Sequence, residues 1–315
     1  MMKTRGATFL KNGGLRILGK TVPKPEPGEV QVETSVCGIC ALDTYAFKHG
    51  LKALSFTPPM GHEGVSYVLK TGPGVKDLKP GDRVAGGSFA RISNIAEDAL
   101  YRLPASDLGD EHWIAEPVSC VVTGLDLCRL LPGDRVAVIG CGFFGLMFIQ
   151  GLVNSYADRV IGFDINRKRL ELAEQFGADA VYDAKPQAVK KHLKKLKALD
   201  IDVVIDTTGL PAGLALAEEI VKTGGRINLF GWNHGQGVFS GNRWHLGGYT
   251  VVNSSPFGRI RDTYPAAIRI IEKGLIDLRP LVTHVVPFNQ MNKFLKSLTA
   301  GKEPGYIKGV VKLKP

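Results

Sequence analysis

The sequence has few cysteines and no long apolar run. Its 315 residues include five cysteines, too few and odd in number for a disulfide framework. No run approaches the roughly eighteen apolar residues that a membrane-spanning helix requires. The N-terminal segment MMKTRGATFLKNGGLRILGK lacks the long apolar core and cleavage site of a secretory signal. We therefore expect a cytoplasmic protein with no disulfide and no membrane contact.

Negative charge is in the minority. There are 40 lysines and arginines against 30 acidic residues, which gives a formal net charge of +10. Much of the excess lies in stretches such as VKKHLKKLK, which is typical of a solvated helix face. No aromatic residues are interleaved there and no nucleic-acid module is recognisable, so no specific nucleic-acid partner is expected. A non-catalytic nucleotide-binding protein whose basic surface contacts RNA stays open as an alternative.

The chain changes character near residue 130. Before this point, short β-rich runs alternate with Pro and Gly turns, which predicts a small barrel of short strands. After it, apolar strands such as DRVAVIG alternate with helical segments such as RKRLELAEQFGA, which predicts a parallel sheet between helices. The C-terminal segment returns to short strands and one helix. We predict an α/β protein with a catalytic domain (1–125), a nucleotide-binding domain (126–271) and a C-terminal segment (272–315) that rejoins the first.

A glycine motif lies at a predicted strand-to-helix junction. VIGCGFFG contains Gly140, Gly142 and Gly145 in a G-x-G-x-x-G pattern, in which the glycines permit a tight turn, close approach of a pyrophosphate and close helix packing. Asp164 ends the next predicted strand, where a carboxylate accepts hydrogen bonds from the adenosine ribose and repels a 2′-phosphate. NAD is therefore favoured, although the basic cluster at 166–169 keeps NADP as the weaker alternative.

A Cys-x-x-Cys pair, Cys37 and Cys40, has three possible interpretations. A thioredoxin-like pair would precede a helix in a βαβ unit, and this one lies in the β-rich part. A structural zinc site needs four ligands, and the other cysteines are isolated. A catalytic zinc site needs about three protein ligands, which Cys40, His62 and Glu63 would supply. The segment GHEG alone is equally compatible with a turn and a core histidine. The isolated cysteines are Cys120, Cys128 and Cys141.

The whole chain resembles the zinc-dependent medium-chain dehydrogenase/reductase superfamily, specifically its polyol (sorbitol-type) branch. The motifs that carry the resemblance are PEPGEVQVE, GICALD, GHEGVSYV, GPGVKDLKPGDRV, AEPVSCVV, GDRVAVIGCGFFG, GADAVYD, IDTTG, GGRINLFG and LVTHVVPF. The resemblance implies a GroES-like catalytic domain and a Rossmann domain. It also implies hydride transfer between NAD and a secondary alcohol of a polyol, sugar or cyclitol at one Zn²⁺ site, in a homo-oligomer (dimer or tetramer).

The resemblance also implies roles for individual residues. Cys40, His62 and Glu63 match metal ligands, with Cys37 as a buried neighbour, and Asp43 matches an acid that orients a ligand. Glu116 of AEPVS matches an acid that holds the zinc-bound water or substrate and sometimes ligates; it also suits the cap of a helix that starts near Pro117. Besides the glycine motif and Asp164, the cofactor positions are Phe144, Arg169, Leu229, Phe230, Gly231, Asn253, Ser254 and Ser255.

Three features depart from the family pattern. The segment GDRVAGGSFARISNIAEDALYRLP lacks the cysteine-rich lobe of a structural zinc, so one metal per chain is expected. Leu42 replaces the hydroxyl that relays the substrate proton in many relatives, and Tyr45 occupies a position that several relatives use for relay or substrate contact. The segment NSSPFGRIRDTYP differs from the sorbitol enzymes, which leaves the substrate open. A zinc-free quinone or enoyl reductase on the same scaffold is the main alternative, although such reductases lack the Cys/His/Glu set.

Overall fold

The structure is a computed structural model that describes residues 1–54, 56, 60–232, 239–255 and 258–314. The chain divides into two compact units. Unit 1 contains Met1–Pro117, Ala267–Glu272 and Asp277–Pro315, and unit 2 contains Val118–Ala266 and Lys273–Ile276. No helix among these described residues is both long and apolar enough to cross a membrane.

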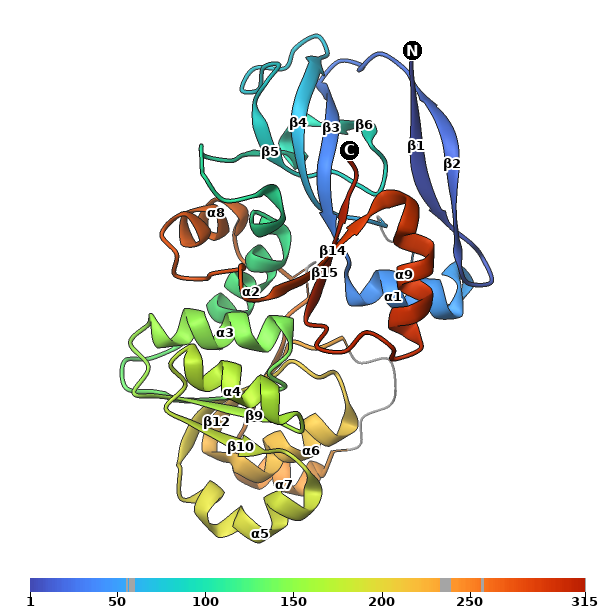
Figure 1. Ribbon diagram of the computed structural model, residues 1–315. Helices are drawn as coiled ribbons and strands as arrows, with labels where there is room; N and C mark the ends of the chain where they lie inside the picture. Colours follow the sequence, from blue (N-terminus) through green and yellow to red (C-terminus); the bar gives the residue numbers. More distant parts are fainter. Residues whose placement is uncertain (55, 57–59, 233–238, 256–257, 315) are drawn as a thin grey trace. The chain divides into compact units, whose positions relative to one another are not determined.

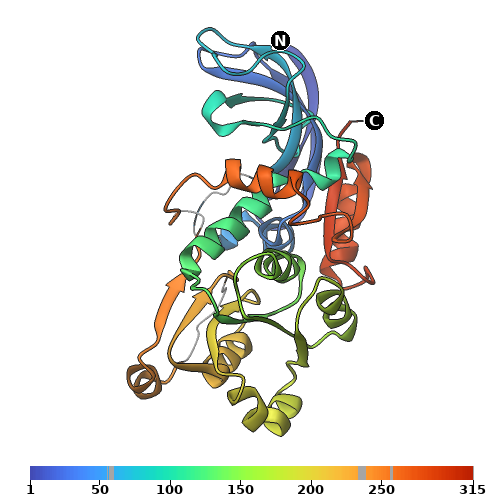
Figure 2. The ribbon, with the colours of Figure 1, turned by 90° about the vertical axis from the view of Figure 1, so that its left-hand side faces the viewer.

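Unit 1 is built on a seven-stranded sheet that joins the two ends of the chain. The central strand β3 (Glu29–Gly38) pairs with β4 (Glu63–Thr71) on one side and with β15 (Lys308–Lys312) on the other, both antiparallel. Figure 2 shows the blue and cyan strands of this sheet curving together. The other strands are β5 (Arg83–Ala85), β6 (Ile92–Ala96), β7 (Tyr101–Arg102) and β14 (Val282–Pro287), and β1 (Met2–Phe9) and β2 (Leu15–Val22) form a separate hairpin.

Two helices of unit 1 pack together although they come from opposite ends of the chain. Helix α1 (Ala41–His49) follows β3, and α9 (Met291–Thr299) lies between β14 and β15. They lie side by side (Figure 1), and Phe47 of α1 shares a buried apolar cluster with Leu295 of α9. The sequence analysis did not predict α1. Short 3₁₀ helices cover Leu51–Ala53, Glu97–Ala99, Asp110–His112 and Phe288–Gln290.

Unit 2 contains a parallel six-stranded sheet. Its strands are β8 (Arg135–Ile139), β9 (Arg159–Asp164), β10 (Ala180–Asp183), β11 (Ile201–Asp206), β12 (Val221–Leu229) and β13 (Thr250–Asn253). Their spatial order is β10-β9-β8-β11-β12-β13. Counted from the first strand of the unit, this is the order 3-2-1-4-5-6 of dinucleotide-binding folds, and it confirms the predicted Rossmann sheet.

The helices that lie wholly in unit 2 are α3 (Phe143–Val153), α4 (Arg167–Gln175), α5 (Pro186–Lys197), α6 (Pro211–Ile220) and α7 (Gly241–Gly247). Helices α2 (Ala115–Cys128) and α8 (Tyr264–Glu272) each contain residues of both units. The sequence predicted neither α7 nor α8. Helix α7 has seven residues, GNRWHLG, and two of them are glycines, which weaken the helical pattern.

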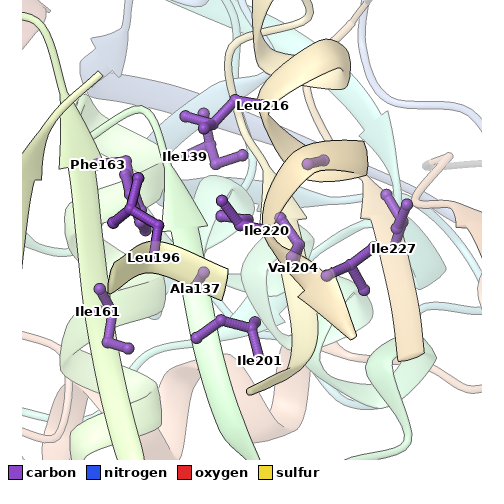
Figure 3. Packing of buried hydrophobic residues seen from close by; sticks show 12 residues of the cluster. Ala137, Ile139, Ile161, Phe163, Leu196, Ile201, Val204, Leu216, Ile220 and Ile227 are labelled. Atoms are coloured by element: carbon purple, nitrogen blue, oxygen red, sulfur yellow. The ribbon is translucent and has the colours of Figure 1, made fainter. Parts of the chain in front are cut away.

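Alternating side chains give the sheet two apolar faces. Ile139 and Phe163 belong to a buried cluster with Leu196 of α5 and with Leu216 of α6 (Figure 3). Gly162, the neighbour of Phe163, faces the other way, because a Cβ there would lie 3.4 Å from the Cβ of Ala173 in α4. Successive residues of a strand point to opposite faces, so helices cover both sides of this sheet.

Candidate functional site

A thiol, an imidazole and a carboxylate converge in unit 1. Cys40 lies between the end of β3 and the start of α1, His62 immediately precedes β4, and Glu63 is the first residue of β4. The register of β3 and β4 pairs Gly38 with Glu63, which brings the two segments together. As a result, one ligand atom from each of Cys40, His62 and Glu63 lies within 4.8 Å of the others. Cys37 points elsewhere, into a buried apolar cluster.

Asp43 ties the two ligand-bearing segments together. Its side chain is fully buried, and one carboxylate oxygen accepts a hydrogen bond of 2.8 Å from the backbone N–H of Cys40. The other oxygen accepts one of 3.3 Å from the N–H of Gly61, next to His62. Burial raises the pKa of Asp43 to about 6, against the lowering effect of His62 and these N–H groups. Asp43 therefore fixes the backbone beside both residues.

The second candidate site lies at one edge of the unit 2 sheet. In a parallel sheet all the carboxyl ends meet at one edge, which is where open α/β folds bind ligands. The register aligns Ile139 with Phe163 and with Asp206, and it aligns Leu229 with Asn253. The predicted cofactor positions lie at or just beyond these strand ends. They are Gly140, Gly142, Phe144, Gly145, Asp164, Leu229, Phe230, Gly231, Asn253, Ser254 and Ser255.

The glycine motif has the geometry that its sequence predicts. Gly140 has φ +89°, a left-handed conformation that favours glycine. Gly142 is the N-cap of α3, and a Cβ added to it would find only the guanidinium of Arg169, at 3.9 Å. A Cβ on Gly145 would lie 1.8 Å from the carbonyl oxygen of Gly140. The loop therefore depends on Gly145 for its own packing, and Gly142 leaves space above the helix N-terminus.

Asp164 is oriented by backbone groups at the end of β9. It is 6% exposed, and its carboxylate accepts hydrogen bonds of 2.7 Å from the N–H of Cys141 and 2.8 Å from the N–H of Asn166. The first of these links Asp164 to the glycine motif itself. Within the basic cluster that kept NADP open, Arg167 is engaged with Glu171 and Glu174 of its own helix.

Aromatic and hydroxyl contacts connect other predicted cofactor positions. The ring of Phe144 lies 4.9 Å from the ring of Phe230, which itself contacts the buried Phe148 at 4.8 Å. Ser254 donates a hydrogen bond of 2.7 Å to the side-chain oxygen of the buried Asn228. Phe144 and Ser254 therefore both pack against other residues at the carboxyl edge of the unit 2 sheet. Their contact with a cofactor stays a prediction.

Comparison with known proteins agrees with this arrangement. Residues 26–105 match the family model of the alcohol dehydrogenase GroES-like domain, and residues 144–273 match that of the zinc-binding dehydrogenases. The chain is 27% identical to the sorbitol dehydrogenase of Bos taurus over 344 residues, which cover 96% of this chain and 94% of that protein. The chain belongs to the zinc-type medium-chain dehydrogenases. It falls in their polyol branch, and its fold is GroES-like in unit 1 and Rossmann-like in unit 2.

Two further relatives show how wide this dehydrogenase family is. The (R,R)-butanediol dehydrogenase of Bacillus subtilis is 25% identical over 329 residues (91% of this chain and 93% of that protein). The crystal structure of 2R,3R-butanediol dehydrogenase from Bacillus subtilis has a TM-score of 0.87 and 24% identity, with 99% and 100% of the two chains covered. A Sinorhizobium meliloti structure described as a putative zinc-binding dehydrogenase bound to NADP has a TM-score of 0.84 at 20% identity, with 99% and 100% of the two chains covered.

The ligand group of this dehydrogenase concentrates negative charge around one imidazole. Burial disfavours the charged ring, but the hydrogen bond with Cys40 and the charges of Glu116 and Glu63 outweigh it and raise the pKa of His62 to about 11. Burial also raises the pKa of the Cys40 thiol, although the contact with His62 opposes that shift. This distribution of negative charge favours a cation beside the three side chains.

The donor set fits Zn²⁺ in chemistry and in spacing. Zinc prefers thiolate, imidazole and carboxylate ligands at roughly 2.0–2.3 Å, and one such atom from each of the three residues lies within 4.8 Å of the others. Glu63 gives independent support. Its carboxylate is completely buried, and its Oε1 atom accepts no hydrogen bond from any described residue, a costly state that a metal ion would relieve.

Two other predicted catalytic residues lie outside the three-residue group. Glu116, in the first turn of α2, is near enough for its charge to raise the pKa of His62, yet among the described residues the candidate ligand group does not include it. Tyr45 lies on α1, and its ring packs 4.6 Å from the ring of His49. Their catalytic roles stay predictions.

The sequence analysis missed Lys308. This residue begins β15, and its ammonium forms an ion pair with the Glu63 carboxylate. Its side chain is 4% exposed, which is exceptional for a lysine. In sequence it is one of several lysines in GYIKGVVKLKP, and only its burial in the folded protein distinguishes it from the exposed Lys312 and Lys314.

Proposed function

We propose that this protein is a zinc-dependent oxidoreductase that transfers hydride between NAD and a secondary alcohol of a polyol, sugar or cyclitol. The observation that carries the proposal is the convergence of Cys40, His62 and Glu63 within 4.8 Å. Zinc-free reductases on this scaffold lack this set of cysteine, histidine and glutamate. Each of the three side chains is a good zinc ligand, and together they leave a coordination position for a substrate oxygen.

The chain's own residues prepare the site. Cys40 and Glu63 provide two negative charges, and His62 gives up its proton to bind as a neutral ligand. Asp43 holds the backbone on both sides of the group through its two N–H contacts. Bound Zn²⁺ would supply Lewis-acid polarisation of the substrate oxygen. The residues that hold it would be Cys40, His62 and Glu63.

Two residues support a polyhydroxylated substrate and a water-assisted proton path. Glu116 brings a second carboxylate close to His62, which suits a substrate with vicinal hydroxyl groups. Leu42 has no hydroxyl, so the alcohol proton leaves through another group. Glu116 and the Tyr45–His49 ring pair on α1, whose His49 is exposed, are the groups proposed for this step.

Asp164 supports NAD over NADP. Two backbone N–H groups orient its carboxylate at the sheet edge, where a ribose bearing hydroxyls would be accepted and a 2′-phosphate would be repelled. Arg167, one of the basic residues that would favour a phosphate, is paired with acids on α4.

The test is a screen of NAD⁺ and NADP⁺ reduction with polyols, cyclitols, sugars and simple alcohols. The same preparation is assayed after removal of metal with a chelator and again after addition of Zn²⁺. We expect NAD⁺-linked activity on at least one polyhydroxylated substrate, loss of that activity on metal removal and recovery with zinc. Activity that persists without metal, on a quinone or an enoyl substrate, would favour the zinc-free reductase instead.

A further inference from the structure

Lys308 and Glu63 form a fully buried ion pair beside the candidate metal ligands. Their side chains are 4% and 0% exposed. The Lys308 ammonium also donates a hydrogen bond of 3.0 Å to the carbonyl oxygen of Ile39, the residue before Cys40. Burying two opposite charges costs several kcal/mol for each ion, and an apolar pair of similar volume is often as stable. Stability alone therefore does not explain this pair.

The strand order of unit 1 creates the contact. Strand β3 lies between β15 and β4, so Lys308 and Glu63 approach from the two neighbours of one central strand. They meet across Gly38, where a Cβ would lie 2.0 Å from the Oε2 atom of Glu63. The absence of a side chain at Gly38 lets the carboxylate lie over β3 and reach the ammonium.

The two oxygens of Glu63 have different surroundings. Neither oxygen accepts a hydrogen bond from any residue that the structure describes, but Oε2 forms the ion pair with the Lys308 ammonium. Both oxygens are buried, so water does not compensate Oε1. Lys308 therefore binds one oxygen of the carboxylate, Oε2, and the other oxygen, Oε1, can bind a metal ion.

We propose that Lys308 is a positioning residue that shares the Glu63 carboxylate with the metal. It holds Oε2, leaves Oε1 as a single, weakened ligand atom, and so keeps Glu63 exchangeable at the zinc. This inference rests on the proposed function, because it requires that a metal bind at Cys40, His62 and Glu63.

The ion pair between Lys308 and Glu63 also changes the net charge around a bound metal. With Cys40 as thiolate and Glu63 as carboxylate, a bound dication is formally neutralised, and Lys308 restores one positive charge. A carboxylate that is also bound to an ammonium donates less to the metal. Lys308 therefore keeps the metal a stronger Lewis acid and leaves one coordination position easier to exchange for substrate.

The experiment measures zinc affinity by competition with a chromophoric chelator in purified full-length protein. We expect Lys308→Met to bind Zn²⁺ about tenfold more tightly than the parent, because Glu63 is then fully available. The same substitution at Lys312, an exposed lysine on the same strand, is the matched control and leaves the affinity unchanged.

The Glu63→Gln background separates positioning from simple charge repulsion. Lys308→Met is made in the parent and in the Glu63→Gln variant. If Lys308 acts through Glu63, the substitution increases zinc affinity clearly more in the parent than in Glu63→Gln. Equal tightening in both backgrounds would show that the ammonium only repels the metal at a distance, and this would overturn the inference. Unchanged affinity in Lys308→Met would overturn it as well.

Thermal unfolding gives a readout that needs no turnover. Without metal, Lys308→Met leaves a buried carboxylate without its cation and lowers the unfolding midpoint by more than about 5 °C. Added Zn²⁺ then stabilises this variant more than it stabilises the parent. An equal zinc-induced shift in both proteins would contradict the sharing of Glu63.

A second variant covers the case in which Lys308→Met does not fold. Lys308→Arg keeps the charge, and its guanidinium binds both carboxylate oxygens. We expect zinc affinity about tenfold weaker than in the parent, and unchanged affinity would overturn the inference. A parent that binds no zinc would overturn the proposed function together with the inference, whereas a parent that binds zinc but ignores Lys308 would overturn the inference alone.

Discussion

The candidate metal centre of unit 1 and the nucleotide edge of unit 2 are built from different parts of the polypeptide. In the metal centre, ligand atoms of Cys40, His62 and Glu63 lie within 4.8 Å of one another. Asp43 accepts a hydrogen bond from the backbone of Cys40, and Lys308 forms an ion pair with Glu63. The nucleotide edge consists largely of backbone at the ends of parallel strands, and it depends on glycines that leave room. Removal of a charged side chain should therefore weaken metal binding in unit 1. Addition of a side-chain atom to a glycine should weaken the packing or the cofactor binding of the nucleotide edge in unit 2.

The largest expected effect separates the two cysteines of the Cys-x-x-Cys pair. We expect Cys40→Ser to abolish zinc binding and to lower activity by at least about a thousandfold, because a metal ligand is lost. Binding of NADH, measured by fluorescence titration, stays intact because unit 2 is unchanged. Cys37→Ala, the matched control in the neighbouring apolar cluster, keeps its zinc, and a Cys37→Ala protein without zinc would contradict the comparison.

The glycine motif offers a matched pair within unit 2. Gly145→Ala forces a methyl group against the carbonyl of Gly140, which costs about 1–3 kcal/mol of unfolding free energy. Gly142→Ala meets nothing closer than 3.9 Å, so its stability stays within about 0.5 kcal/mol of the parent while its NADH affinity falls. Denaturant unfolding and NADH titration distinguish the two, and equal destabilisation would show that Gly142 has a packing role.

A substitution of Asp43 tests whether zinc binding needs the carboxylate that holds the backbone beside Cys40 and His62. Asp43→Asn exchanges one acceptor oxygen for an amide that faces a backbone N–H of Cys40 or Gly61. We expect zinc affinity to fall about 10–100-fold, as for other groups that orient metal ligands. Asp110→Asn, which breaks an ion pair with Arg83 elsewhere in unit 1, is the control. A loss of zinc in both variants would point to general destabilisation.

The smallest effect is expected from a substitution of Asp164, which tests the preference for NAD over NADP. Asp164→Ala removes the ribose acceptor, and we expect NADH to bind about tenfold more weakly while NADPH binds no worse than before. Asp183, which pairs with Asp164 in the sheet register and is exposed, is the matched control as Asp183→Ala. Equal weakening of both cofactors would remove the basis for preferring NAD.

Much of unit 2 was predictable from sequence because its signals are local. DRVAVIG was expected as a strand and contains β8 (Arg135–Ile139), and the glycine motif lies at the junction of β8 and α3 as expected. The missed elements are short. Helix α1 has nine residues with weak amphipathic character, and its start at Cys40 is stabilised by Asp43, a contact that propensity alone does not reveal.

The sequence by itself determined the alternation of strands and helices in the nucleotide-binding half and most of the chemical groups at both candidate sites. It supplied a thiol, an imidazole and adjacent carboxylates, and it supplied glycines where backbone must approach a ligand. Only the tertiary structure decided that Glu63 pairs with Lys308, because Lys308 reaches it through the lateral order β15-β3-β4. That order arises from pairing between distant segments, and no local pattern encodes which buried charge will face which.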